Sequence, residues 1–593
     1  MKMKYQIGEK MKMNIKIGDT PKNRISVVIV GIILAYFLIG LRLYYLQIYK
    51  GDYYKKASQN NRIRIRKIKA PRGKIYDRNG KLLVTNVAGY QLVYLKGRKY
   101  NDEIINEMSK LLGMKKDDII RRIKKGIIHR YTGENLLIDD ILEEKAHKML
   151  EKLSDYPYLE ILTYPKRKYV NGKIASHVLG YVKKITREEW EKLKDEGYEK
   201  TDIIGKKGIE KQYDKLLKGQ DGYEYIEVNA LNQIVKKIRN RNPILGKDIY
   251  LSLDLDLQKK VTEFIGPKKG SFIALDVKTG EIITAVSSPE YDLNKVSSKI
   301  SSKDWAKILD NKNRPLQNRL VSSSYPPGSI FKPITALAIL KEGISPEEEI
   351  YDGGYYKIGK WKWRNWKTYG VGNVAMEQAM IHSNNIYFYT MGDRIGRKTI
   401  LDISKKMGLG ERTGIDLPEE KKGTLPSNNW KKEQLKEQWY RGDTVNLSIG
   451  QGFLLITPLQ AVQIYMIIAN EGIGYKPHFL KKVANEEEIK PEISKKVELD
   501  IKDYQIIKQQ LRKVVTNGTA YQINLEKIKS AAKTGSAENP QYKKTHAWVA
   551  GYCPYDKPEI AFVSFFEGAG HGGEEAGPTV KKFLEDYYEG RNK

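Results

Sequence analysis

Residues 325–340 read Tyr325-Pro326-Pro327-Gly328-Ser329-Ile330-Phe331-Lys332, followed by PITALAIL, and this stretch decides the fold. Two prolines and a glycine interrupt any preceding element, so the apolar run predicts a helix that begins at or just after Ser329. Pro333 falls in the first turn of that helix, where its missing N–H would have no intrahelical partner. The sequence therefore predicts an apolar helix whose first turn carries Ser329.

Ser329 and Lys332 are candidates for a nucleophile and its base. Residues three apart share one face of a helix, and Ser329 lies at the positive end of the helix dipole, which favours an oxyanion nearby. A lysine acts as a base only when its pKa is lowered, which burial and a second cation nearby would do. The pair predicts covalent catalysis by serine, although a pattern this short recurs by chance.

Order and context make the signal specific. Ser-x-x-Lys occurs again at Ser530, Ser-x-Asn also starts at Ser58 and Ser427, and Lys-Thr-Gly also starts at Lys278. Only one combination runs from a nucleophile helix through Ser-x-Asn on a second helix to Lys-Thr-Gly on a strand. Its residues are Ser329, Lys332, Ser383, Asn385, Lys533, Thr534 and Gly535. Lys278 precedes the nucleophile in a hairpin turn, and Ser530 shares its lysine with the strand, so both are rejected.

The regions around these motifs alternate apolar strands with turn signals. The turns at 76–80 and 276–281 lie between strand-like runs, so each predicts a hairpin. Residues 546–552 and 559–568 predict further antiparallel strands beside the Lys533 strand, whereas 101–155 predicts helices from leucines spaced three and four apart. Beyond residue 248 the charged pattern gives way to apolar strand-like runs, so we place a domain boundary near residue 246.

An uncharged apolar run extends from Ile25 to Leu41, with Arg24 and Arg42 at its edges and Tyr44 just beyond. Its length suits a short membrane-spanning helix, and the tyrosine suits the interface. A cleaved signal peptide is the alternative, but no small-x-small cleavage site follows. Residues 1–24 carry more Lys and Arg than residues 42–62. We therefore expect an uncleaved single-pass anchor in the cell membrane with a cytoplasmic N-terminus.

Composition excludes several classes of function. The chain of 593 residues is long enough for two or three domains, and its net charge of +33 is spread along the whole sequence. No nucleic-acid reader motif accompanies that charge, so we expect no nucleic-acid partner. A single cysteine excludes an intrachain disulfide and a Cys-based zinc cage, and no His-x-x-x-His pattern occurs. We expect no cofactor.

The three ordered motifs resemble the signature of the penicilloyl-serine transferases. Further blocks, in one order, resemble the class B penicillin-binding proteins: 70–80, 175–181, 205–213, 447–452 and 457–460. One minor departure is that Val170 follows Tyr169 where the family has proline. The resemblance implies an α+β fold with a transmembrane helix, an elongated pedestal, and a transpeptidase domain built on a five-stranded antiparallel sheet flanked by helices. The implied ranges are a tail at 1–24, the anchor at 25–45, the pedestal at 46–245 and the transpeptidase domain at 246–593.

The resemblance also implies the chemistry, a D-Ala-D-Ala transpeptidase that cross-links peptidoglycan stem peptides and is inhibited by β-lactams. Ser329 would attack the penultimate D-alanine carbonyl, with Lys332 taking its proton. Ser383 would relay that proton to the departing D-alanine, while Asn385 would hold the substrate amide. The carboxylate-binding strand would supply Lys533, Thr534, Gly535 and Ser536. The N–H groups of Ser329 and Ser536 would form the oxyanion hole.

The segment before Ser329 and residues 351–367, which are rich in tryptophan, resemble the elongation-type enzymes, penicillin-binding protein 2. Some members of that branch hold a metal here with two Asp, a His and a Cys. This chain retains only Asp352, with Asn365, Val371 and Asn384 at the other positions. One carboxylate does not hold zinc, so we predict no structural metal. The tryptophans are candidates for either core packing or the edge of the substrate groove.

The implied partners are stem peptides on lipid-linked precursor strands, β-lactams, the membrane, and a SEDS-family glycosyltransferase reached through the pedestal and transmembrane helix. A division- or sporulation-type class B enzyme remains an alternative, as does a non-catalytic wall-assembly scaffold. A bifunctional class A enzyme needs a glycosyltransferase domain where the pedestal blocks lie. A β-lactamase or lactam sensor has no use for such a pedestal.

Overall fold

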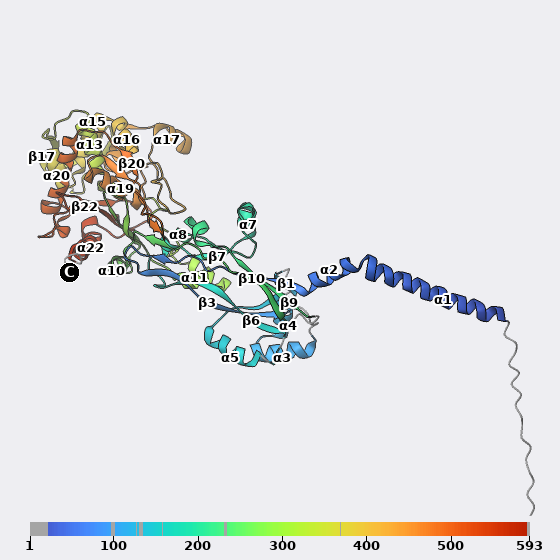
Figure 1. Cartoon of the computed structure of the whole chain (residues 1–593). Coiled ribbons are helices and arrows are strands. Elements are labelled where there is room, and N and C mark those ends of the chain that lie inside the picture. Colours follow the sequence, from blue (N-terminus) through green and yellow to red (C-terminus); the bar gives the residue numbers. More distant parts are fainter. Residues whose placement is uncertain are drawn as a thin grey trace, which may run out of the picture.

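The computed structural model shows an elongated molecule, with a projecting N-terminal helix, a middle region of long strands and a globular C-terminal region (Figure 1). The structure describes residues 22–95, 101–125, 127–129, 134–153, 155–156, 158–229, 234–367 and 369–589. Nearly all of the predicted cytoplasmic tail, residues 1–24, lies outside these ranges.

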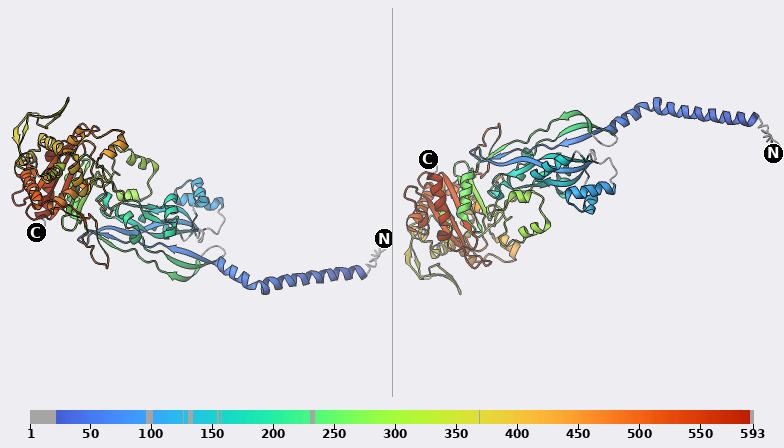
Figure 2. Two further views of the ribbon diagram at one scale, coloured as in Figure 1. Left: turned by 90° about the horizontal axis from the view of Figure 1, so that it is seen from above. Right: turned by 90° about the horizontal axis from the view of Figure 1, so that it is seen from below.

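The N-terminal helix has the properties of a membrane-spanning segment. Helix α1 (Lys22–Tyr44) continues through a π-helical turn (Tyr45–Tyr49) into α2 (Gly51–Arg62). Residues Ile25–Tyr49 are long and apolar enough to cross a membrane, and their most apolar part is not buried inside the protein. An apolar helix without protein contacts is suited to lipid, and α1 projects away from the rest of the chain (Figure 2).

The pedestal is built on long antiparallel strands. A three-stranded sheet, in the order β1-β9-β10, follows the anchor, and β3 pairs along its length with β6. The strands are β1 (Ile63–Ile68), β2 (Ile75–Tyr76), β3 (Leu82–Leu95), β4 (Ile127–His129), β5 (Glu134–Ile141), β6 (Leu159–Tyr169), β7 (Val182–Lys184), β8 (Ile203–Gly205), β9 (Gly222–Val228) and β10 (Ile234–Arg241). The helices are α3 (Asp102–Leu112), α4 (Lys116–Lys125), α5 (Glu143–Leu153), α6 (Ser176–Leu179), α7 (Arg187–Leu193), α8 (Gly208–Gln212) and α9 (Asp214–Leu217).

The prediction of helices throughout 101–155 is wrong in its middle part. Helices α3, α4 and α5 are present, but β4 and β5 lie between α4 and α5. Strand β5 pairs with β3, opposing Ile138 to Leu92, and buries Leu137. Pairing with β3, and not the leucine spacing, therefore determines that residues 134–141 form a strand.

The three pedestal blocks singled out in the sequence meet in space. Arg72 of the first block donates to Glu210 of the third at 2.8 Å, and Arg167 donates to the other oxygen of the same carboxylate at 2.5 Å. All three side chains are buried, so each charge depends on the others for compensation. His177 of the second block contacts the Pro315 carbonyl of the C-terminal region at 2.8 Å, and burial lowers the pKa of His177 to about 3.

Backbone hydrogen bonds connect the pedestal to the C-terminal region. One sheet runs in the order β19-β11-β2-β3-β5-β4, so the pedestal strand β2 pairs with β11 (Ile249–Leu251), which pairs with β19 (Leu480–Val483). The predicted hairpin at 76–80 is confirmed, since β2 and β3 pair antiparallel around it.

The C-terminal region contains the expected five-stranded antiparallel sheet, in the order β13-β12-β23-β22-β21. Its strands are β12 (Gly270–Asp276), β13 (Ile282–Ser288), β21 (Ala531–Ala537), β22 (His546–Cys553) and β23 (Ile560–Phe566). The predicted hairpin at 276–281 and the strands predicted after Lys533 are confirmed. Strand β21, which carries Lys-Thr-Gly, lies at one edge of the sheet.

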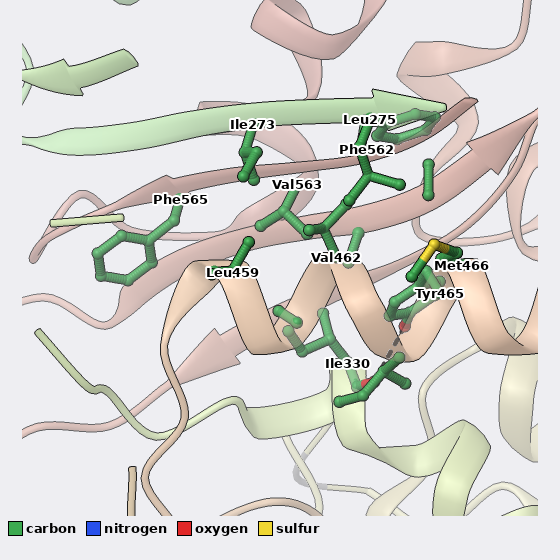
Figure 3. Packing of buried hydrophobic residues seen from close by; sticks show 14 of the residues in the cluster. Ile273, Leu275, Ile330, Leu459, Val462, Tyr465, Met466, Phe562, Val563 and Phe565 are labelled. Atoms are coloured by element: carbon green, nitrogen blue, oxygen red, sulfur yellow. Dashed lines mark hydrogen bonds between the residues drawn. The ribbon is translucent and has the colours of Figure 1, made fainter. Parts of the chain in front are cut away.

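Helix α19 (Pro458–Ala469) packs between this sheet and the segment that contains Ser329. Every one of its residues is buried, as expected for a helix that is apolar on all faces. Figure 3 shows Leu459 and Val462 directed toward Val563 of the sheet, with Tyr465 close to Ile330. The Tyr465 hydroxyl donates to the Ile330 carbonyl at 2.9 Å. The helix therefore fixes the distance between the sheet and the Ser329 segment.

The other elements of this region complete its two helical faces and several short hairpins. The helices are α10 (Leu255–Ile265), α11 (Leu293–Ser297), α12 (Ser302–Leu309), α13 (Lys332–Lys341), α14 (Met376–Ile381), α15 (Asn385–Ile395), α16 (Arg397–Lys406), α17 (Asn428–Leu435), α18 (Arg441–Ser448), α20 (Ile501–Asn517), α21 (Gly572–Glu575) and α22 (Gly577–Glu589). The short strands are β14 (Ile350–Asp352), β15 (Tyr355–Ile358), β16 (Trp361–Arg364), β17 (Gly372–Val374), β18 (Ile473–Tyr475) and β20 (Ile493–Lys496).

Candidate active site

Ser329 lies in a 3-10 turn, Gly328–Phe331, that leads directly into α13. The α-helix itself begins at Lys332, and Pro333 occupies its first turn as predicted. Gly328 has φ +57°, a conformation that favours glycine, and its N–H donates to the Gly450 carbonyl at 2.9 Å. Ser329 is half-buried while the residues on both sides of it are buried, so its side chain is among the few of this turn open to a substrate.

Hydrogen bonds from distant elements hold the Tyr-Pro-Pro-Gly segment. The Trp548 indole of β22 donates to the Pro326 carbonyl at 3.1 Å. The Tyr325 hydroxyl donates to Glu567 at 2.6 Å, and the buried guanidinium of Arg319 donates to the same carboxylate oxygen at 3.0 Å. Because Arg319 compensates the charge of Glu567, this carboxylate is a stable anchor for the turn before Ser329.

Lys332 is fully buried and bonded to the Ser-x-Asn motif. Its Nζ donates to the Ser383 carbonyl at 2.8 Å, to the Ser383 hydroxyl at 3.2 Å and to Asn385 Oδ1 at 2.7 Å. Burial, and then the positive charge of Lys533, lower the pKa of Lys332 well below its ordinary value. The two features required of a lysine base, burial and a second cation, are therefore both present.

Ser383 and Asn385 both contact Lys332, but Ser383 does not lie on a helix. It occupies a turn between α14 and α15, with φ +55°. Asn384 caps α15 by accepting from the Tyr387 N–H at 3.0 Å, and Asn385 is the first residue of that helix. The left-handed turn ends α14 and brings both the carbonyl and the hydroxyl of Ser383 to Lys332.

The Lys-Thr-Gly motif lies on β21 beside the Ser329 turn. Gly535 is required by close packing, because a Cβ there would lie 2.9 Å from the Pro327 carbonyl oxygen. Burial lowers the pKa of Lys533 to about 7. The Thr534 hydroxyl lies 2.6 Å from that of Thr519, and the exposed Ser536 accepts from the Gly572 N–H at 3.2 Å. An edge strand next to a nucleophile can pair with an extended peptide.

The rejected copies of the motifs lie elsewhere. Lys278 lies in the β12–β13 turn and donates to Asn470 at 3.1 Å. Ser427 caps α17, and Ser58 lies in α2 next to the membrane anchor. Ser530 is buried, and its hydroxyl donates to the Ile523 carbonyl at 3.4 Å. Order along the chain therefore selected the copies that come together in space.

A buried polar node supports the Ser383 turn, and the sequence did not predict it. The Asp352 carboxylate, fully buried, accepts from Asn384 at 2.6 Å, from Asn365 at 3.2 Å and from the Gly354 N–H at 2.7 Å. Asn365 Oδ1 in turn accepts from the Asn385 N–H at 3.2 Å. Asn384 is therefore bonded directly to Asp352, and Asn385 is connected to Asp352 through Asn365.

This node does not have the composition of a metal site. Its donor set is one carboxylate and two carboxamides whose nitrogens both point at that carboxylate, while Val371 is apolar and exposed. Among the described residues, no group of three or more His, Cys, Asp and Glu could hold a metal ion. Hydrogen bonds to Asp352 connect Asn365 with Asn384 in this node.

Comparisons with known proteins agree with this geometry. Residues 270–585 match the penicillin-binding protein transpeptidase domain, and residues 67–251 match the penicillin-binding protein dimerisation domain. The peptidoglycan D,D-transpeptidase MrdA of Haemophilus influenzae is 33% identical, over 95% of this chain and 91% of that protein. The corresponding protein of Escherichia coli K12 is 31% identical, over 96% of this chain and 94% of that protein.

Solved structures extend the likeness to the whole architecture. The penicillin-binding protein PBP2 of Helicobacter pylori, solved in complex with MreC, superposes with a TM-score of 0.79 at 32% identity, covering 89% of this chain and all of that one. A chain from a peptidoglycan synthase complex superposes with a TM-score of 0.70 at 30% identity, covering 95% of this chain and 98% of that one. This chain therefore belongs to the class B penicillin-binding proteins, in the elongation-type PBP2 branch of serine D-Ala-D-Ala transpeptidases that cross-link peptidoglycan.

Proposed function

We propose that Ser329 is the nucleophile of this transpeptidase and that Lys332 is its general base. The Ser329 oxygen attacks the carbonyl carbon of the penultimate D-alanine, and its proton passes to neutral Lys332. Ser383 relays a proton to the amine of the terminal D-alanine as the C–N bond breaks. An amine of a second stem peptide then attacks the ester and releases Ser329. The ordinary carbonyl chemistry of acyl transfer needs nothing beyond these groups.

The observation that carries this proposal is the pair of buried lysines beside one half-buried serine. Burial, and then the positive charge of Lys533, lower the pKa of Lys332, so Lys332 loses its proton well below its ordinary range. The contact of Lys332 with the Ser383 hydroxyl supplies the path along which a proton returns to the leaving group, and Asn385 Oδ1 holds the Lys332 Nζ in place. A lysine held only by carboxylates would have the opposite tendency.

Substrate recognition is assigned to the edge strand β21. We place the terminal carboxylate of the stem peptide against Lys533, Thr534 and the hydroxyl of Ser536, and the substrate amide against Asn385. The N–H groups of Ser329 and Ser536 are the donors for the oxyanion. The closeness of Gly535 to the Pro327 carbonyl supports this, since it brings the strand and the Ser329 turn within one substrate width.

Intact-protein mass after incubation with benzylpenicillin tests the assignment. Wild type should carry one stable penicilloyl group, and Ser329→Ala should carry none while unfolding at the same temperature. Ser530→Ala, the other serine followed by lysine, is the matched control and should be acylated like wild type. An adduct on Ser329→Ala would refute the assignment, and rapid drug hydrolysis without an adduct would indicate a β-lactamase.

We further propose the topology and the partner. Residues 1–24 lie in the cytoplasm, the 46–245 pedestal and the 246–593 transpeptidase domain lie outside the membrane, and the pedestal and α1 contact a SEDS-family glycosyltransferase. The H. pylori relative was solved with MreC, and another relative comes from a peptidoglycan synthase complex, which supports partners of this kind. Protease added outside spheroplasts should digest the chain beyond residue 46 and spare an N-terminal tag.

A further inference from the structure

Exposed aromatic side chains are concentrated next to the catalytic turn, in residues 351–369. Tyr351, Tyr355, Trp361, Trp366 and Tyr369 are 76%, 49%, 65%, 54% and 64% exposed. All eight tryptophans of the chain lie in the described residues, and of these only Trp361 and Trp366 are more than half exposed. Large rings left in water beside an active site are typical of a binding surface.

Strands β15 and β16 form a hairpin with two different faces. Tyr356 pairs with Trp363 on the inner face, where the Trp363 indole donates to Asn446 at 3.0 Å and the Tyr356 hydroxyl donates to Asp393. Alternation along a strand then directs the neighbouring pairs, Tyr355 with Arg364 and Lys357 with Lys362, to the opposite face. That outer face is exposed at all four positions.

The outer face is positively charged and has no internal compensation. Residues 353–374 contain no Asp or Glu, and in the described residues no ion pair involves Lys357, Lys362 or Arg364. The cations alternate with the rings: Lys362 Nζ lies 4.7 Å from the Tyr355 ring centre, and Lys367 Nζ lies 5.2 Å from that of Trp366. A ligand that fits must offer both flat apolar surfaces and anionic groups.

The hairpin is joined directly to the catalytic machinery. Asn365, the residue after β16, accepts from the Asn385 N–H at 3.2 Å, and the Trp366 indole donates to the His382 carbonyl at 3.1 Å. The strand that closes this segment, β17, lies at the end of the molecule remote from α1 (Figure 1). A lipid headgroup at the membrane surface is therefore far from the hairpin, whereas a peptidoglycan strand attached through its stem peptide to Ser329 would be close to it.

We propose that the outer face of the β15–β16 hairpin binds the peptidoglycan strand whose stem peptide reacts at Ser329. A sugar ring stacks on Tyr355, and stem-peptide carboxylates pair with Lys357, Lys362 and Arg364. This inference rests on the proposed function and adds to it a site for the polymer outside the catalytic groove. Polymer binding here raises the local concentration of stem peptides at the edge strand β21.

Two readouts on the full chain in detergent separate this site from the catalytic centre. The first is the dissociation constant for soluble, un-cross-linked peptidoglycan strands, and the second is the rate of acylation by benzylpenicillin, which has no glycan. K357E/K362E/R364E should weaken strand binding by roughly tenfold or more, as expected when several exposed contacts are lost together, and Y355A should weaken it by a smaller factor. Both should be acylated within about twofold of wild type.

A charge-matched control is Lys398→Glu, Lys432→Glu and Lys502→Glu combined, since these lysines are exposed and lie outside the hairpin. It should bind strands like wild type; equal weakening by the control would overturn the proposal, as would unchanged binding in both hairpin variants. If the triple hairpin variant is acylated slowly, Lys362→Gln alone decides: weaker strand binding with normal acylation supports the site, and unchanged binding refutes it. Failure of wild type to be acylated would refute the proposed function and leave the strand-binding result independent.

Discussion

Asp352→Asn tests whether the buried node positions the catalytic turn. In the wild type one carboxylate oxygen accepts from Gly354, and the other accepts from both Asn365 and Asn384. In either orientation, the NH2 group of an asparagine at this position faces the Gly354 N–H or the side-chain NH2 groups of Asn365 and Asn384. At least one buried donor then faces another donor, and the remaining hydrogen bonds lose their charge assistance.

Hydrogen bonds to a charged group contribute about 1.5–3 kcal/mol each, and an unsatisfied buried donor costs about 1–3 kcal/mol. After allowing for relief of the buried charge, we expect Asp352→Asn to lower the free energy of unfolding by about 2–4 kcal/mol. Because Asn384 and Asn385 lose their support, the turn that carries Ser383 shifts. A misplacement of about 1 Å in a catalytic group costs on the order of 100-fold in rate.

The assay is the second-order rate of benzylpenicillin acylation, measured with thermal unfolding on the same samples. We expect acylation to fall by about 10- to 100-fold at temperatures where the variant is fully folded. Asp393→Asn is the control, because its carboxylate binds Tyr356 and Arg441 and does not contact the Ser383 turn. A wild-type acylation rate in folded Asp352→Asn, or an equal loss in Asp393→Asn, would refute the positioning role.

Three further predictions address the lysine pair, the metal and the core. In Lys533→Gln the pKa of Lys332 should rise, since one cause of its depression is removed, so the acid limb of the acylation-pH profile should move to higher pH. The native pKa of Lys533, about 7, lies below its ordinary 10.5, so the unfolded chain binds more protons between these values. Wild-type stability should therefore rise with pH across that window in denaturant titrations, and less so in the variant. Dialysis against a chelator should leave both melting temperature and acylation unchanged, whereas a loss restored by zinc would contradict the hydrogen-bonded node. Tyr465→Phe leaves the buried Ile330 carbonyl without its 2.9 Å donor, which should cost about 1–3 kcal/mol of stability and slow acylation, as urea unfolding and penicillin labelling would reveal.

Much of the catalytic site follows from local rules. The turn before Ser329, the proline in the first turn of α13 and the alternating apolar strands all depend on neighbouring residues. The order of the motifs then selected Ser383 and Lys533 over their copies. These features were predictable because backbone sterics and strand alternation act over a few residues.

The errors and omissions involve contacts between distant parts of the chain. Ser383 was expected on a helix, but it lies in a left-handed turn. Contacts of its carbonyl and hydroxyl with Lys332, which lies on another helix, fix this turn. Strand β5 was missed because its partner β3 is distant in the sequence, with helices α3 and α4 between the two strands. The node at Asp352 required Asn365 and Asn384 to converge, and asparagines carry no spacing signal of their own.

The ladder β2-β11-β19 has a mechanical consequence. Strand β2 comes from the pedestal, while β11 and β19 come from parts of the transpeptidase region that are far apart in the sequence, and backbone hydrogen bonds join all three. A displacement of the pedestal is therefore transmitted to β19 through backbone hydrogen bonds as well as along the chain. A rotation of the pedestal about this joint must therefore break or distort these backbone hydrogen bonds, unless the bending takes place within the β3–β6 ribbon.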